Sequence, residues 1–85
     1  MIGNDELLIK VKNGLGITGD FQDNTLQIYI DEVKDFMHGA GVSDAIINSN
    51  RTIGVITRGV SDLWDYGSGS TGLSPYFKER VGRIP

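Results

Sequence analysis

The sequence predicts an all-α fold, a small bundle of four to five helices that ends in a short C-terminal helix after a Gly/Ser hinge. Apolar residues recur at steps of three and four along most of the chain, and no stretch alternates apolar with polar residues as a half-buried strand would. With 85 residues, of which 39% are hydrophobic, the chain suits one domain. A domain of this size buries only roughly 60 to 65% of its unfolded surface, so we expect a partner or an oligomer to add stability.

Two helices are predicted in the first half of the chain. Asn4 is a candidate N-cap for the first, and Asn13 with Gly14 forms its expected stop. The second is the most regular, and it lies between a polar stretch at residues 20–24 and a stop at residues 39–41. Its apolar face consists of Leu26, Tyr29, Ile30, Val33, Phe36, Met37 and Ala40.

The second half is expected to hold a short helical turn at residues 43–47, a break at 48–50 and a further helix over 51–66. Gly54 and Gly59 each cost this last helix about 1 kcal/mol relative to alanine, a loss that tertiary contacts must offset. Its apolar stripe is formed by Ile53, Ile56, Val60, Leu63 and Trp64.

The chain divides by composition into a helical core at residues 1–66, a flexible hinge at 67–73 and a C-terminal arm at 74–85. The hinge is rich in glycine and serine, and Ser74 followed by Pro75 is a strong helix start. The net charge is −3, which works against tight binding of nucleic acid, although the arm itself is basic.

Several patterns resemble chemical motifs but lack the context that the chemistry needs. Residues 14–19 match G-x-G-x-x-G, yet a helix precedes them, so we interpret them as a turn between helices. Residues 67–74 resemble a phosphate loop in which Leu73 replaces the lysine. We therefore expect no cofactor. The chain has no cysteine, which excludes disulfides, a thiolate nucleophile and Cys-based zinc sites.

Acid–base chemistry also lacks a convergent set of residues. His38 is the only histidine, and its spacing from Asp35 is one that any solvated helix face produces. Asp31, Glu32 and Asp35 are interpreted as the polar side of the second helix, with Lys34 among them. We expect neither catalysis nor a metal site.

Apolar residues outside the main stripes suggest self-association. Ile28 lies about 200° around its helix from Leu26, and Val55 and Tyr66 lie off the stripe of their helix. Gly59, between those two, allows another helix to approach closely. The alternative, that these are ordinary isolated surface residues, is equally open.

The order of several short segments resembles the head-tail connector, or head-completion adaptor, proteins of tailed bacteriophages. The segments are LLIKVK at 7–12, LGIT at 15–18, the polar stretch at 20–24, AGV at 40–42, GVSDLWDYG at 59–67 and LSPYFK at 73–78. The resemblance implies a structural virion protein, assembled in the host cytoplasm, that forms a ring of about a dozen subunits beneath the portal protein. Such a ring extends the DNA channel without gripping DNA and docks a tail-side stopper or joining protein. It involves no cofactor, turnover or membrane.

The last helix has two opposite interpretations. In the first, it is a docking arm for another subunit or for the portal. In the second, Phe77 and Val81 fold back onto the chain's own bundle. The docking arm would offer aromatic anchors and a basic rim. Those residues are Tyr76, Phe77, Lys78, Arg80 and Arg83.

Two rivals belong to other functional classes. A small helical DNA-binding regulator would use residues 51–66 as its recognition helix, but Arg51 and Arg58 are the only basic groups there, and Asp62 and Asp65 would face phosphate. A small hydrolase lacks a nucleophile, base and oxyanion set.

Overall fold

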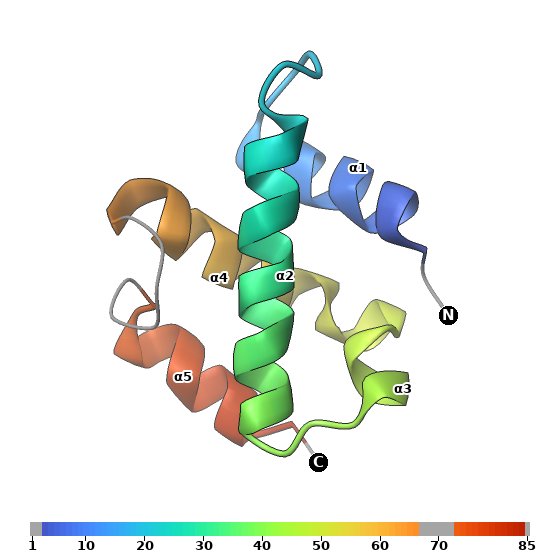
Figure 1. Cartoon of the computed structure of the whole chain (residues 1–85). Coiled ribbons are helices and arrows are strands. Elements are labelled where there is room, and N and C mark those ends of the chain that lie inside the picture. The colour runs from blue at the N-terminus through green and yellow to red at the C-terminus, as the bar shows by residue number, and fades with distance from the viewer. Residues whose placement is uncertain (1–2, 67–72, 85) are drawn as a thin grey trace.

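The computed structural model describes residues 3–66 and 73–84, and every regular element in these ranges is helical. The all-α class is therefore confirmed. The elements, in chain order, are α1 (Asn4–Leu15), α2 (Asp23–Gly39), α3 (Asp44–Ile47), the 3-10 turn η1 (Asn50–Thr52), α4 (Ile53–Tyr66) and α5 (Pro75–Gly82) (Figure 1).

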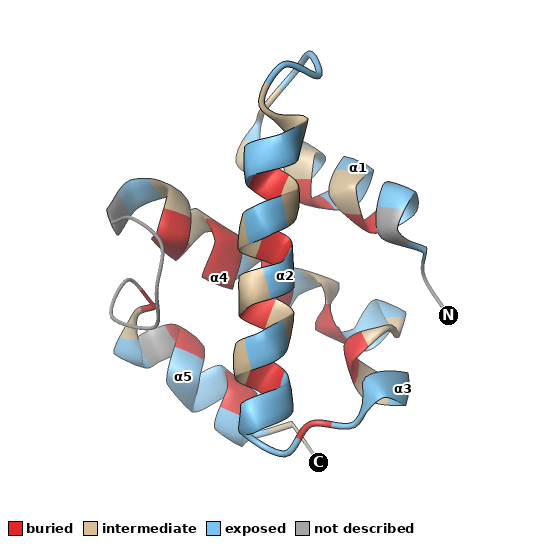
Figure 2. Ribbon diagram, viewed as in Figure 1, coloured by how far each residue is buried: buried red, intermediate tan, exposed pale blue. Residues whose placement is uncertain are grey.

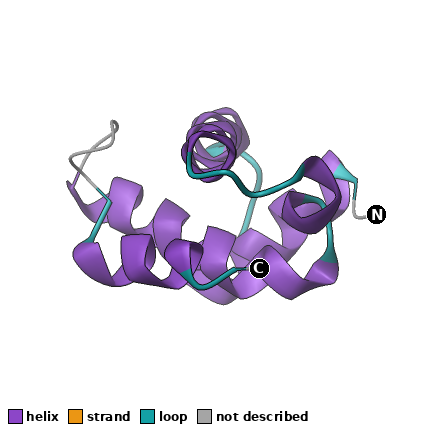
Figure 3. Ribbon diagram, turned by 90° about the horizontal axis from the view of Figure 1, so that it is seen from below, coloured by secondary structure: helices purple, strands orange, loops and turns teal. Residues whose placement is uncertain are grey.

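The helices form two layers. α2 crosses over a layer that contains α1, α4 and α5, as the end-on view of α2 in Figure 3 shows. α4 is the central element, since it contacts α1, α2, α5 and η1. Buried positions follow the faces where the helices meet (Figure 2). These buried apolar residues are Leu7, Val11, Leu26, Ile30, Val33, Met37, Val42, Ile47, Val55, Ile56, Val60, Leu63, Leu73, Phe77 and Val81.

α1 differs from expectation at both ends. Asn4 is its first residue rather than its cap, and the N-cap is Gly3. The helix continues past Asn13 and Gly14 to Leu15, because the left-handed residue that ends it is Gly16, with φ of 72°. The glycine-rich run at residues 14–19 thus forms the end of a helix and the turn after it, as the missing nucleotide-binding context indicated.

Serine side chains cap two helices, α3 and α5, and the cap at Ser74 was expected. Ser43 Oγ accepts a hydrogen bond from Ile46 N at 3.4 Å, and Ser74 Oγ accepts one from Phe77 N at 3.1 Å. Trp64, expected in the core, is partly buried and packs edge-on against Tyr29, with ring centroids 6.1 Å apart.

Asp62 joins α4 to the start of α5. This buried carboxylate accepts hydrogen bonds at Oδ2 from the backbone N of Ser74 at 3.1 Å and from its Oγ at 2.7 Å. Ser74, the N-cap residue of α5, is therefore held to α4 by both its backbone and its side chain. Leu73, assigned by composition to the hinge, is buried beside this contact, and the rest of the hinge lies outside the described residues.

Gly59 lies where neighbouring helices pack closely against α4. A Cβ atom built on Gly59 would lie 2.7 Å from Phe77 Cε1 and 2.9 Å from Val33 Cγ2. The expected close approach at this glycine therefore exists, but the approaching helices are α2 and α5 of the same chain. The cost of a mid-helix glycine is offset by this contact.

Gly59→Ala is expected to destabilise the protein by about 1 to 3 kcal/mol, because the new methyl group displaces a packed aromatic ring and a β-branched side chain. Chemical denaturation followed by circular dichroism measures the change. Gly54→Ala, in the same helix, is the matched control, since its Cβ would meet nothing within 4 Å. That variant should gain about 1 kcal/mol. Equal gains in both variants would contradict the packing described here.

Candidate interaction surfaces

α5 folds onto the bundle. Phe77 is fully buried and its ring lies 5.6 Å from that of Phe36, while Val81 is also buried. The docking arm with Phe77 as an outward anchor is therefore wrong, and the alternative of a helix folded back on its own chain holds. The physical reason is Gly59, which leaves room for the ring on α4. The side chains of Tyr66 and Tyr76 lie outside the described residues.

The two other apolar candidates have opposite outcomes. Ile28 is 62% exposed on α2, as expected. Val55 is only 5% exposed, so its predicted place on a free face is wrong. Since α4 lies in the middle of the bundle, neighbouring helices cover it on more than one side. A single apolar stripe therefore predicts too few of its buried residues.

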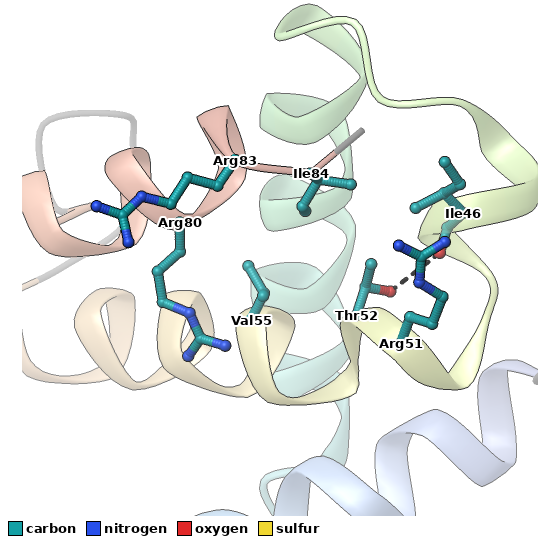
Figure 4. Close-up of a pocket in the computed structure, with 7 residues that line it drawn as sticks. All are labelled: Ile46, Arg51, Thr52, Val55, Arg80, Arg83 and Ile84. Carbon is teal, nitrogen blue, oxygen red and sulfur yellow. Dashed lines mark hydrogen bonds between the residues drawn. The ribbon is translucent and has the colours of Figure 1, made fainter.

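A cleft lies between α5, η1 and α3, at the end of α5 (Figure 4). Its cavity volume is about 270 Å³. Val55, Ile46 and Ile84 supply apolar surface, and arginine side chains stand at opposite sides. We call it the basic cleft, and its lining residues are Ile46, Arg51, Thr52, Val55, Arg80, Arg83 and Ile84.

Of the three arginines that line the basic cleft, one forms an ion pair with another described residue. Arg83 Nη2 lies 2.5 Å from Glu79 Oε1, one turn back on α5. Arg51 and Arg80 have no ion-pair partner within residues 3–66 and 73–84. The cleft therefore combines an apolar floor with guanidinium groups that are available to a carboxylate or another anion. Lys78, by contrast, is exposed on α5 and does not line the cleft.

The outward face of α2 is acidic. Asp31 and Asp35 are exposed and Glu32 is half-buried, and Asp31 Oδ1 accepts a hydrogen bond from Gln27 Nε2 at 3.0 Å. His38 Nε2 contacts Asp44 Oδ1. In the described part of the chain, no three His, Asp or Glu side chains are grouped so as to hold a metal ion.

Among the residues that the structure describes, the most exposed large apolar side chain is Phe21, at 91%, and the sequence reasoning missed it. Ile9, 59% exposed on α1, was also missed. A signal was present for each. Phe21 is a lone aromatic residue in a polar stretch between two helices, and Ile9 lies about 200° around α1 from Leu7.

The turn that carries Phe21 is held at both ends by one lysine. Lys12 Nζ donates to the carbonyl of Gly19 and lies 2.7 Å from Asp23 Oδ1. Asp23 N also donates to the carbonyl of Asp20 at 3.2 Å. This set of contacts fixes the tip at residues 20–22 relative to α1 and α2, so the Phe21 ring is presented on a braced turn.

The role of α4 as a recognition helix has no support in this geometry. Its residues Val55, Gly59 and Leu63 are buried against neighbouring elements, and Asp62 is bonded to Ser74. A helix enclosed in this way does not reach the bases of a major groove. Within the described ranges, none of the helices has the length and apolar content to cross a bilayer.

No protein-family model, curated protein or solved structure matches this chain.

Phe77→Ala is expected to lower the free energy of unfolding by about 3 to 5 kcal/mol, because a fully buried ring is removed and a cavity remains. Thermal denaturation measures the loss. Lys78→Ala, the next residue and an exposed one, should change stability by less than about 0.5 kcal/mol. A Phe77→Ala variant that melts with the parent chain would show that α5 does not contribute to the core.

Proposed function

We propose that the chain is a structural subunit of the head-tail connector of a tailed bacteriophage. In this role, copies of the chain assemble into a ring beneath the portal protein. The ring extends the channel through which DNA passes and offers a surface to the next tail-side protein. The chain acts by assembly and needs no cofactor.

The observation that carries this proposal is the set of large apolar side chains left on the surface. Ile9, Phe21 and Ile28 are all more than half exposed. They belong to α1, to the turn after it and to the first half of α2, which lie together at one end of the molecule (Figure 1). Large apolar side chains left exposed on a small domain are candidates for a protein–protein contact. An oligomer would cover these residues and add stability to a small core.

The segments that carry the phage resemblance also contact one another. Gly59 and Asp62 belong to the segment at residues 59–67, and they contact Phe77 and Ser74 of the segment at 73–78. The resemblance thus rests partly on residues that fix α5 to α4. These contacts are a physical reason for both segments to occur in one chain.

The charge of the surface suits a channel component. The acidic face of α2, with Asp31 and Asp35 exposed, repels phosphate rather than holding it. DNA that must slide through a ring is not retained by such a surface. The exposed arginines of the basic cleft lie away from this face, on the side of the molecule opposite α2 (Figures 1 and 4).

Light scattering and native mass spectrometry, over rising concentration and with a purified phage portal protein, test the proposal. We expect a closed oligomer of about a dozen copies, visible as rings by negative-stain microscopy. A chain that stays monomeric at high concentration and on the portal contradicts the proposal.

A gel shift at low salt separates the rival class, because a DNA-binding regulator retards DNA and a connector subunit of this net charge does not.

A further inference from the structure

We infer that the Phe21 turn of one copy inserts into the basic cleft of a second copy, so that copies join end to end. This inference rests on the proposed function for its premise of self-assembly, and it names the surfaces that meet. Its first half is the projecting ring of Phe21. Its second half is the apolar floor between Arg51 and Arg80.

The Phe21 turn has the properties of an interface anchor. The ring is 91% exposed, and the backbone around it is braced by the contacts of Lys12 with Gly19 and Asp23. A rigid aromatic side chain on a fixed turn loses little conformational entropy when it binds. Aromatic residues that fill pockets are frequent binding hot spots.

The basic cleft has the size and lining for that ring. Its volume of about 270 Å³ exceeds the roughly 150 Å³ of an apolar cavity known to hold benzene. Val55 and Ile84 provide apolar contact for the ring. Arg51 and Arg80 stand at opposite sides, where a guanidinium group packs well against an aromatic face.

Charge complementarity favours a second copy as the occupant. Asp20, next to Phe21, is exposed and so brings a carboxylate to the rim together with the ring. Neither Arg51 nor Arg80 has an ion pair with any other described residue. A carboxylate against a guanidinium forms a charge-assisted hydrogen bond. A small inorganic anion would satisfy the arginines but leave the floor formed by Val55 and Ile84 uncovered.

The positions of the two surfaces determine the kind of assembly. The Phe21 turn lies at the top of Figure 1, whereas α3 and the end of α5, which line the basic cleft, lie in the lower half. Each copy therefore offers one projecting turn and one cleft at separate places. Contacts of this head-to-tail type build a ring when the rotation from each copy to the next returns to the first copy, and a filament when it does not.

Two substitutions block the two halves separately. Phe21→Ser removes the anchor and leaves the cleft, and Arg80→Glu reverses the charge of the cleft and leaves the anchor. Each should raise the self-dissociation constant at least about tenfold in sedimentation velocity. At a dilution where the parent chain is monomeric too, their melting temperatures should match its own, because both side chains are exposed. Matched controls are Asn24→Ser, which changes another exposed side chain close to the turn, and Lys78→Glu, which makes the same charge change outside the cleft. Both controls should assemble as the parent does.

Mixing the two blocked variants tests the head-to-tail geometry. Arg80→Glu still has its Phe21, and Phe21→Ser still has its cleft, so one intact contact forms between them. At a concentration where each variant alone is monomeric and the parent assembles, the mixture should give a 1:1 dimer and nothing larger. A mixture that remains monomeric overturns the inference.

The outcomes separate this inference from the proposed function. If the parent forms rings that neither substitution weakens, the inference is wrong and the connector proposal stands. If both substitutions abolish assembly but the parent forms only open filaments and ignores the portal, the inference stands and the connector proposal is wrong. If Asn24→Ser weakens assembly as much as Phe21→Ser, assembly does not depend on the Phe21 ring in particular and the inference is overturned.

Discussion

Gly59 has no side chain at the point where α2, α4 and α5 meet, and the position of α5 depends on that absence. The gap admits the ring of Phe77 on one side and the methyl groups of Val33 on the other. With Phe77 seated, the far end of α5 brings Arg80 and Ile84 beside η1 and α3. The basic cleft is therefore a consequence of how the core packs.

Most residues that stabilise the fold differ from those proposed to bind another copy. Buried apolar residues hold the helices together, and the large exposed ones, Ile9, Phe21 and Ile28, belong to α1, the turn after it and α2. Asp62 and Ser74 hold α5 by buried hydrogen bonds, and Lys12 braces the Phe21 turn. If the Phe21 turn and the basic cleft meet as proposed, each new contact between copies adds to the stability of the domains that it joins.

Helices and caps were largely predictable from the sequence, because they depend on local patterns such as the α2 stripe and the Ser74 cap. Faces were harder to predict. Val55 was assigned to a free surface because periodicity treats each helix as having one buried side, whereas α4 is covered on several. Phe77 had two open interpretations, because one short amphipathic helix fits either an outward or an inward face. The cleft joins residues that are distant in sequence, so no local pattern indicates it. Phe21 was predictable in principle, as the only aromatic residue in a polar turn.

A photo-cross-link from residue 21 tests the assembly most directly. A benzophenone analogue of phenylalanine placed at Phe21 keeps an aromatic ring on the turn and reacts with the groups it touches. Irradiation of the assembled protein, followed by proteolysis and mass spectrometry, should join residue 21 of one copy to Val55 or Ile84 of another. Cross-links that map instead to α1 or α2 of the second copy, or rings that form with no cross-link at this position, would contradict the account.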